Sequence, residues 1–422
     1  MKWVYPEISG DDVLEYSKQF RLSSLFTRIL LNRNIRSPEA LQRYFDKSAY
    51  SLYDPFSMLD MNRAVEILER ALAAGKKILI YGDYDVDGVT STSILYLFLR
   101  ALTETVYYYI PEREKEGYGL SCEGIDFAIE RDIDLIITCD CGITAEEEVA
   151  YACEKGMELI ITDHHEQAAT LPPASAILNP KRHEDNYPFR DLCGAGVVFK
   201  FVEAFYIRRE GSAEKARRFL DLVAIGTAAD IVPLADENRC LVREGLERIR
   251  KRECRIGILE LFNVCKMDTA GISVMNIVFG LAPRLNAVGR MGSASRAITL
   301  LTTDDRRIAR QYSVILHQEN EERQKVERRV TAEAVKQAEE KYAGYIPKAL
   351  VLAGNWHPGV IGIVSSKIKD RFHRPVFLIA LKDGEGKGSG RSINGFDLYE
   401  ALTECKAYLS GYGGTRWQRD LQ

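Results

Sequence analysis

Short apolar runs alternate with stretches of helical periodicity from residue 76 onward. The runs at residues 78–81, 135–137 and 159–161 consist mainly of isoleucine and leucine, and none is long enough to be a buried helix. Runs of this length are typical of strands buried on both faces of a parallel sheet, with helices in the crossover connections. The pattern predicts an α/β domain over residues 76–303.

The first 75 residues follow a different pattern. Short helical stretches are interrupted by Asn34, Ser37 and Pro55, and the last of them is an amphipathic stretch at residues 61–74. We expect residues 1–75 to form an N-terminal helical extension that offers packing surface and carries no obvious chemistry.

Beyond the domain, a highly charged segment at residues 304–342 has no proline or glycine, and its apolar residues recur at helical spacing. It predicts a helical connector at residues 304–343. Strand-like runs at 349–353 and 375–381 then flank a helical stretch, which indicates a smaller α/β domain over residues 344–422. We therefore predict an α/β fold in which a parallel-sheet domain is joined by a long helix to a smaller α/β domain. The active site is expected in the cleft between the two.

Composition mainly excludes some classes of protein. The 422 residues carry a formal net charge of −4, so nucleic-acid contact must come from local basic residues or from bound cations. The nine cysteines include no CxxC pair and follow no secretory leader, which indicates reduced thiols. No apolar run approaches the roughly 18 residues that a membrane span needs. We expect a cytoplasmic protein with no membrane partner.

Three of the predicted strands end directly on side chains that bind metals. In strand order these side chains are Asp83, Asp85 and Asp87; then Asp140; then Asp163, His164 and His165. Ligands of open parallel sheets bind beyond the carboxyl ends of the strands, so these residues should converge. Converging carboxylates repel one another unless a cation lies among them. Oxygen ligands with imidazole and no clustered thiolates favour Mn²⁺ or Mg²⁺.

Each part of this pattern also has an ordinary structural interpretation. Acidic residues after a strand serve as helix N-caps, so Asp85 and Asp87 fit a cap as well as a metal site. Asp230, in an apolar stretch of small residues, taken alone fits a helix end better than a ligand. Cys139 and Cys141 flank the carboxylate of the second strand, and strand alternation predicts that both point away from it. The joint pattern favours the metal site.

Four segments, in order, carry a family resemblance. Residues 83–88, 140, 163–165 and 226–230 resemble the four motifs of the DHH phosphoesterase superfamily. Residues 111–120 and 282–291 are similar to its RecJ-like branch of single-stranded-DNA-specific exonucleases, and residues 354–362 and 388–392 resemble the DHH-associated C-terminal domain, DHHA1. The resemblance spans roughly residues 23–414.

The resemblance implies a two-metal exonuclease that hydrolyses phosphodiester bonds of single-stranded DNA from 5′ to 3′ in DNA repair and recombination. The implied catalytic residues are Asp85, Asp87, Asp140, His164, His165 and Asp230. The implied ligands of two Mn²⁺ or Mg²⁺ ions are the same set with Asp83 in place of His165, and Asp140 bridges the ions. His165 would contact a phosphate oxygen or assist proton transfer. A single-strand-binding protein and a helicase are the implied protein partners.

The resemblance also implies a surface for the DNA strand. The candidates are Arg284, Asn286, Arg290, His357, Gly390, Arg391 and Ser392. Glycines before a helix expose backbone N–H groups to an anion, and a guanidinium can fork onto a phosphate. An isolated arginine is usually solvent-exposed or ion-paired, but the neighbouring glycine, serine and asparagine favour contact here. Tyr118, Trp356 and Phe396 fit either base stacking or a core position.

The C-terminus departs from the family pattern. Thr415 follows Gly413 and Gly414 where relatives carry histidine, and no oligonucleotide-binding (OB) barrel follows. The expectation is a truncated chain whose metal centre is intact and whose DNA handling is weakened. Two alternatives stay open: a DHH phosphodiesterase acting on short oligonucleotides or cyclic dinucleotides, and a non-catalytic accessory protein that binds nucleic acid.

Overall fold

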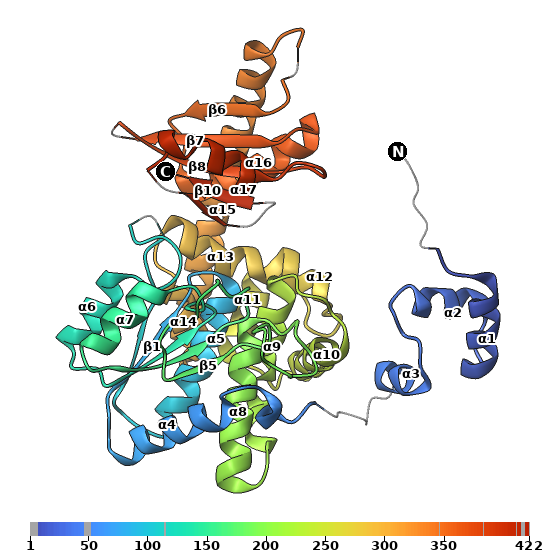
Figure 1. The fold of residues 1–422 in the computed structure, drawn as a ribbon, viewed down its shortest axis with the longest axis vertical. Helices are drawn as coiled ribbons and strands as arrows, with labels where there is room; N and C mark the ends of the chain where they lie inside the picture. The colour runs from blue at the N-terminus through green and yellow to red at the C-terminus, as the bar shows by residue number, and fades with distance from the viewer. Residues whose placement is uncertain are drawn as a thin grey trace.

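The chain folds into two sheet-containing bodies joined by one long helix, with a group of N-terminal helices beside the first body (Figure 1). The computed structural model describes residues 7–45, 52–113, 115–345, 347–382, 384–410, 412–414 and 418–421. Thr415, where the sequence departs from the family pattern, lies outside these residues. Within the described part of the chain, no helix is both long and apolar enough to cross a bilayer.

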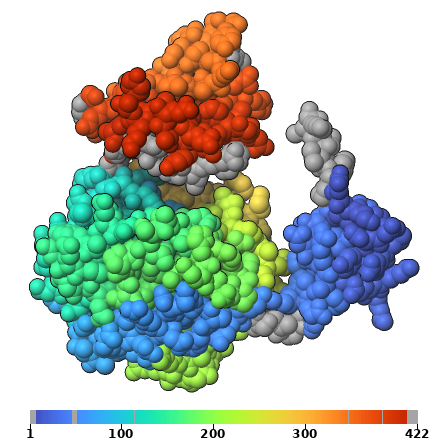
Figure 2. Space-filling view, viewed as in Figure 1, coloured from blue at the N-terminus to red at the C-terminus, as the bar shows by residue number. Residues whose placement is uncertain are grey.

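The N-terminal helices have a small core of their own, which contains Phe20, Leu30 and Ile35. An ion pair of 2.6 Å between Arg43 and Asp236 ties them to the first body, and Figure 2 shows them standing to one side of it. These helices are α1 (Gly10–Phe20), α2 (Ser24–Leu31) and α3 (Pro38–Phe45). The 3₁₀ turn η1 (Pro55–Ser57) and α4 (Met61–Ala73) come next, and α4 packs into the main core of the first body through residues such as Val65 and Leu68 (Figure 1).

The first body is built on a parallel sheet in the order β2-β1-β3-β4-β5. Its strands are β1 (Ile78–Gly82), β2 (Val106–Tyr109), β3 (Leu135–Cys139), β4 (Glu158–Thr162) and β5 (Ala176–Leu178). The three apolar runs recognised in the sequence form β1, β3 and β4, which are neighbours in the sheet. Successive residues of β1 enter opposite cores, with Ile78 and Ile80 on one face and Leu79 on the other. Burial on both faces explains why these runs are apolar throughout.

Helices cover both faces of this sheet and extend the body (Figure 1). The crossover helices are α5 (Val86–Arg100), α6 (Cys122–Glu130) and α7 (Glu146–Glu154). The helices that follow are α8 (Gly194–Glu210), the 3₁₀ turn η2 (Glu214–Phe219), α9 (Leu220–Ala229), α10 (Asp236–Arg250), α11 (Ile256–Val264), α12 (Val274–Asn276), the π-helix η3 (Ile277–Leu281), α13 (Ala282–Met291) and α14 (Ser295–Thr302). All nine cysteines are free.

The charged segment after this body forms one continuous helix, α15 (Arg306–Lys341). It leads into a smaller mixed sheet in the order β6-β7-β8-β10-β9. The elements are β6 (Leu350–Gly354), α16 (Pro358–Phe372), β7 (Val376–Lys382), β8 (Glu385–Arg391), α17 (Leu398–Glu404), the 3₁₀ turn η4 (Lys406–Tyr408), β9 (Tyr412–Gly414) and β10 (Gln418–Leu421). The predicted fold class is confirmed, and the domain boundaries after residues 75, 303 and 343 stay predictions.

Candidate metal centre

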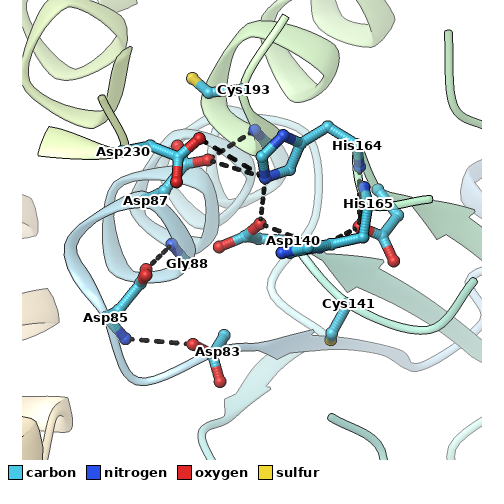
Figure 3. A network of polar contacts seen from close by, with 12 residues as sticks. Asp83, Asp85, Asp87, Gly88, Asp140, Cys141, His164, His165, Cys193 and Asp230 are labelled. Atoms are coloured by element: carbon cyan, nitrogen blue, oxygen red, sulfur yellow. Dashed lines mark hydrogen bonds and ion pairs between the residues drawn. The ribbon is translucent and has the colours of Figure 1, made fainter. Parts of the chain in front are cut away.

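The candidate ligands converge at the carboxyl ends of β1, β3 and β4 (Figure 3). The imidazole of His164 lies at the centre, because its Nε2 is 3.1 Å from Oδ1 of Asp140, 3.7 Å from Oδ2 of Asp230 and 3.8 Å from Oδ2 of Asp87. Asp140 follows β3 and His164 follows β4, and these two strands are neighbours in the sheet. Asp87 lies in the first turn of α5, and Asp230 lies at the end of α9.

Ligand atoms form overlapping groups whose members all lie within 4.8 Å of one another. One group contains Asp87, His164 and Asp230; a second contains Asp83, Asp85 and Asp140; a third joins Asp140 to His164 and His165. Asp140 is therefore shared between two groups, as a residue that bridges two ions would be. The sequence-based set is brought together completely.

The ordinary interpretations of two of these residues also hold. Asp85 is the N-cap of α5, and its carboxylate accepts the N–H of Gly88 at 3.0 Å. Asp230 is the C-cap of α9. A residue can serve both as a helix cap and as a metal ligand, because its backbone is fixed at the helix end while its side chain still reaches outward.

Asp140 adopts a left-handed conformation, with φ of 61°. β3 ends at Cys139, and the left-handed residue turns the chain out of the strand. Cys139 and Cys141 are both fully buried, in the cores on opposite sides of the sheet. Strand alternation would have placed the two side chains on the same side of the sheet. The backbone turn at Asp140 is the reason for the difference.

Asp87 is held by the N-terminus of α8, which the sequence did not indicate. The N–H of Gly194 donates to Oδ2 at 2.5 Å and the N–H of Ala195 to Oδ1 at 2.9 Å. Residue 194 must be small, because a Cβ there would lie 2.7 Å from the Cβ of Asp140 and 3.0 Å from Oδ2 of Asp87. The helix N-terminus thus fixes this carboxylate and offers it partial positive charge.

Asp163 holds the two histidines in place through hydrogen bonds. Its Oδ1 accepts the backbone N–H groups of His164 and His165 at 2.7 and 3.1 Å and lies 2.8 Å from Nδ1 of His165. The Tyr118 hydroxyl contacts the same ring nitrogen at 3.1 Å and donates to the carbonyl of Asp140 at 3.0 Å. Burial alone would lower the pKa of His165, but Asp163 outweighs it and raises that pKa to about 9.

Electrostatics at the centre point to a missing positive charge. Burial, with negative Asp85 adding to it, raises the pKa of Asp83 to about 8 and that of Asp87 to about 6. Burial and the neighbouring carboxylates raise the pKa of Asp140 well above its usual value. Burial also lowers the pKa of His164 to about 3. Carboxylates with such shifts favour a bound cation, which would stabilise their charged forms.

Several buried atoms of the centre have no hydrogen-bond partner. They are Oδ1 of Asp83, Oδ1 of Asp140 and both ring nitrogens of His164. Buried polar atoms are normally satisfied, and a site for an ion is one recognised reason for an exception. Carboxylate oxygens with one or two imidazoles suit Mn²⁺ and Mg²⁺. The residues present therefore fit divalent metal ions.

A group of arginines adjoins the metal centre. Burial, together with the charges of Arg113 and Arg323, lowers the pKa of Arg290 to about 10. Cζ of Arg113 lies 5.2 Å from the ring centroid of Tyr84. Tyr84 belongs to the loop after β1 that also carries Asp83 and Asp85. The sequence did not indicate that Arg113 and Arg323 lie near Arg290. Arg113 belongs to the family-like stretch 111–120 but was not singled out, and Arg323 belongs to the connector, which offered no chemical signal.

Three of the strand-contact candidates, Arg290, His357 and Arg391, lie around the first turns of α16. Nη1 of Arg290 donates to the carbonyl of Gly359 at 3.1 Å. The guanidinium of Arg391 packs closely against the backbone of α16 at Gly362, since a Cβ added there would lie only 2.8 Å from its Nη2. His357 caps the helix by accepting the N–H of Gly359.

The other candidates have partners within the protein. Arg284 donates to the Gly280 carbonyl at 2.5 Å and to Nδ1 of His317 at 3.0 Å. Gly390 and Ser392 are buried in and after β8, and Asn286 is half-buried on α13. Of the stacking candidates, Trp356 belongs to a core, Phe396 is half-buried and Tyr118 is 52% exposed. Contact of any of these residues with a strand stays a prediction.

Comparison with known families gives two matches. Residues 77–227 match the DHH family N-terminal domain, and residues 346–415 match the DHHA1 domain. The chain is 41% identical over 417 residues to the single-stranded-DNA-specific exonuclease RecJ of Bacillus subtilis, which covers 98% of this chain and 52% of that protein. It is 38% identical to the protein of the same name from Escherichia coli, over 92% of this chain and 69% of that protein.

Solved structures agree with these matches. A crystal structure of exonuclease RecJ bound to manganese is similar with a TM-score of 0.76 and 37% identity, over 86% of this chain and 90% of that one. The structure of RecJ from Thermus thermophilus in complex with Mn²⁺ gives a TM-score of 0.84 and 33% identity, over 98% of this chain and 58% of that one. The chain thus spans about half to two thirds of the full-length relatives.

Proposed function

Because the chain belongs to the RecJ family of DHH proteins, we propose that it is a metal-dependent exonuclease that hydrolyses the phosphodiester bonds of single-stranded DNA. The observation that carries this proposal is the pair of ligand groups Asp83–Asp85–Asp140 and Asp87–His164–Asp230, which meet where Asp140 lies 3.1 Å from His164 and which contain buried atoms without a hydrogen-bond partner. Two neighbouring divalent ions can stabilise both the attacking and the leaving oxygen in the hydrolysis of a phosphodiester. The proposal takes the substrate class from the names of the relatives.

The proposed mechanism assigns a separate task to each part of the site. Asp83, Asp85, Asp87, Asp140, His164 and Asp230 are the proposed ligands of two Mn²⁺ or Mg²⁺ ions. When bound, the ions supply Lewis-acid activation of water and neutralise charge on the phosphodiester. The amides of α8 keep Asp87 oriented, and Asp163 keeps both histidines oriented.

His165 and the arginines act on the substrate. The side chain of His165 is 44% exposed and is held in its cationic form by Asp163, so it can donate a proton to a phosphate oxygen. Arg290 and Arg391 approach from α13 and β8 and hold phosphates near the first turn of α16. The arginines therefore bind phosphates of the DNA strand, and the scissile phosphodiester lies at the candidate metal centre.

Further properties are proposed on the family alone. They are 5′ to 3′ polarity, a cytoplasmic location, a role in DNA repair and recombination, and a single-strand-binding protein and a helicase as partners. The relatives are longer than this chain, so these properties of the whole proteins are carried over as proposals.

Release of nucleotides from a labelled single strand tests the function. The purified protein is incubated with Mn²⁺ and a 5′-labelled oligonucleotide, the same strand in a blunt duplex, and a dinucleotide. The proposal expects mononucleotides from the single strand, little from the duplex, and no release in EDTA. Preferred turnover of the dinucleotide would favour a small-substrate phosphodiesterase instead. No release from any substrate at saturating Mn²⁺ would favour an accessory protein.

A further inference from the structure

The residue that follows Asp230 has an unusual conformation. Ile231 adopts φ of 61°, directly after the C-cap of α9. Left-handed residues at this position of a helix end are usually glycine, because a Cβ, and above all a branched one, is strained there. The side chain is also 81% exposed. An exposed β-branched residue in a strained position lowers stability and gains little from burial in return.

The loop that carries Ile231 is held firmly. The next residue, Val232, packs against the main core. The carbonyl of Pro233 accepts a hydrogen bond at 3.1 Å from Nδ2 of Asn238, a fully buried side chain that also donates to the carbonyl of Asp191 at 2.6 Å. These anchors fix the backbone after Ile231, and before it the N–H of Asp230 still donates to the Gly226 carbonyl of α9 at 3.0 Å, so the fold imposes the outward direction of Ile231. Strain of this kind is commonly retained at functional sites.

The position of Ile231 is at the rim of the metal centre. Consecutive Cα atoms are about 3.8 Å apart, and the carboxylate of Asp230 lies 3.7 Å from Nε2 of His164. Ile231 therefore directly follows a candidate metal ligand in the chain, and its exposed side chain is available to a nucleotide bound nearby. Residues 231–235 contain no charged side chain, so this rim is unsuited to a phosphate. It suits the apolar part of a nucleotide, which is the base.

We propose that Ile231, with Leu234 of the same loop, is a substrate-binding residue that packs against the base of the nucleotide at the scissile bond. Leu234 is 39% exposed and extends the same apolar edge. The inference rests on the proposed function, because it takes a nucleic-acid strand as the substrate. It assigns base contact to the first body and phosphate contact to the arginines around α16.

Ile231→Gly separates this role from a structural one. Glycine relieves the backbone strain, so the melting temperature should be unchanged or higher. Loss of the apolar contact should weaken strand binding and raise KM about tenfold, with Mn²⁺ affinity and kcat within about twofold of wild type. Arg252→Gly is the matched control, because Arg252 has the same φ of 61° after the end of α10 and is exposed. It should leave KM unchanged.

A strand whose terminal nucleotide lacks its base gives the decisive comparison. Strand affinity is measured by fluorescence anisotropy in EDTA, where no turnover occurs, for wild type and Ile231→Gly. The difference between the two proteins should be about tenfold on the normal strand and absent on the abasic strand. An equal difference on both strands, or none on either, would overturn the inference. A loss of Mn²⁺ affinity would also overturn it, by showing that Ile231 acts through Asp230.

The same comparison separates the two proposals. A wild-type protein that binds strands with this base dependence but releases no nucleotide would contradict the exonuclease and support the contact. An active wild type with no base dependence at residue 231 would contradict the contact alone.

Discussion

The candidate metal centre differs from the arginine group, by which we mean the strand-contact candidates Arg284, Arg290 and Arg391, in how far the protein itself satisfies its polar atoms. In the metal centre, ligand atoms of Asp83, Asp140 and His164 are buried without a hydrogen-bond partner. In the arginine group, Arg284 and Arg290 donate to the carbonyls of Gly280 and Gly359. The first region needs a cation to satisfy it, whereas the second is satisfied by the protein itself. Changes in the first should alter chemistry and stability, and changes in the second should alter substrate affinity.

The largest effect is expected from Asp140→Asn. Asparagine tolerates the left-handed backbone, so the change removes charge and little else. Turnover should fall by roughly 10³-fold or more, because the shared ligand of both groups is lost. The melting temperature of the metal-free protein should be unchanged or higher, since one repelling carboxylate is gone. Nucleotide release and calorimetry measure the two quantities.

Asp132→Asn is the control for that experiment. Asp132 also has a left-handed backbone, with φ of 53°, and it is exposed. Normal turnover in the control together with more than a tenth of normal turnover in Asp140→Asn would contradict the assigned role of Asp140.

Metal should stabilise the protein. At a Mn²⁺ concentration of 100 times Kd, binding to the folded state alone adds about 2.7 kcal/mol to the free energy of unfolding. The melting temperature of the first body should rise by roughly 5 °C, and EDTA should reverse the rise. If Mn²⁺ leaves the melting temperature of the wild type unchanged, the unsatisfied atoms of the metal centre have another explanation.

Gly194→Ala tests the support of Asp87 by α8. The added methyl group would press on Asp87 and Asp140, so Mn²⁺ affinity should fall roughly 10- to 100-fold, as is typical when the groups that orient metal ligands are disturbed. Gly196→Ala on the same helix is the control, because the nearest atoms that a Cβ there would meet belong to the side chain of Leu192, at 3.2 Å. Equal Mn²⁺ affinity of the two variants in a calorimetric titration would count against this support.

The smallest effect is expected in the arginine group. Arg391→Ala should raise KM for a single strand about tenfold and reduce the salt dependence of binding by about one ion, because one phosphate contact is lost. Mn²⁺ affinity should stay within about twofold of wild type. Arg371→Ala, at the far exposed end of α16, is the control and should change neither quantity. A large fall in Mn²⁺ affinity in Arg391→Ala would break the division between the two regions.

The convergence of most candidate ligands could be predicted from the sequence, because these residues follow strand ends. Parallel strands bury both faces, so β1, β3 and β4 are visible as apolar runs, and the residues after them must lie at one edge of the sheet. Asp230 follows a helix, so its place among the ligands depended on the family resemblance.

The support of the centre could not be predicted in the same way. Gly194 lies more than one hundred residues after Asp87, and its amide, which no side-chain pattern reveals, makes the contact. The turn at Asp140 was missed because an aspartate gives no sign of a left-handed backbone. Arg323 was missed because its position on α15 resembles that of any charged residue of a helix. Tertiary approach, rather than local pattern, decides all three.

Anomalous scattering from a crystal soaked in Mn²⁺ tests the central claim most directly. The account predicts two peaks, one among Asp83, Asp85 and Asp140 and the other among Asp87, His164 and Asp230, with Asp140 contacting both. Absence of Mn²⁺ from these groups at saturating concentration, or peaks confined to other residues, would contradict it.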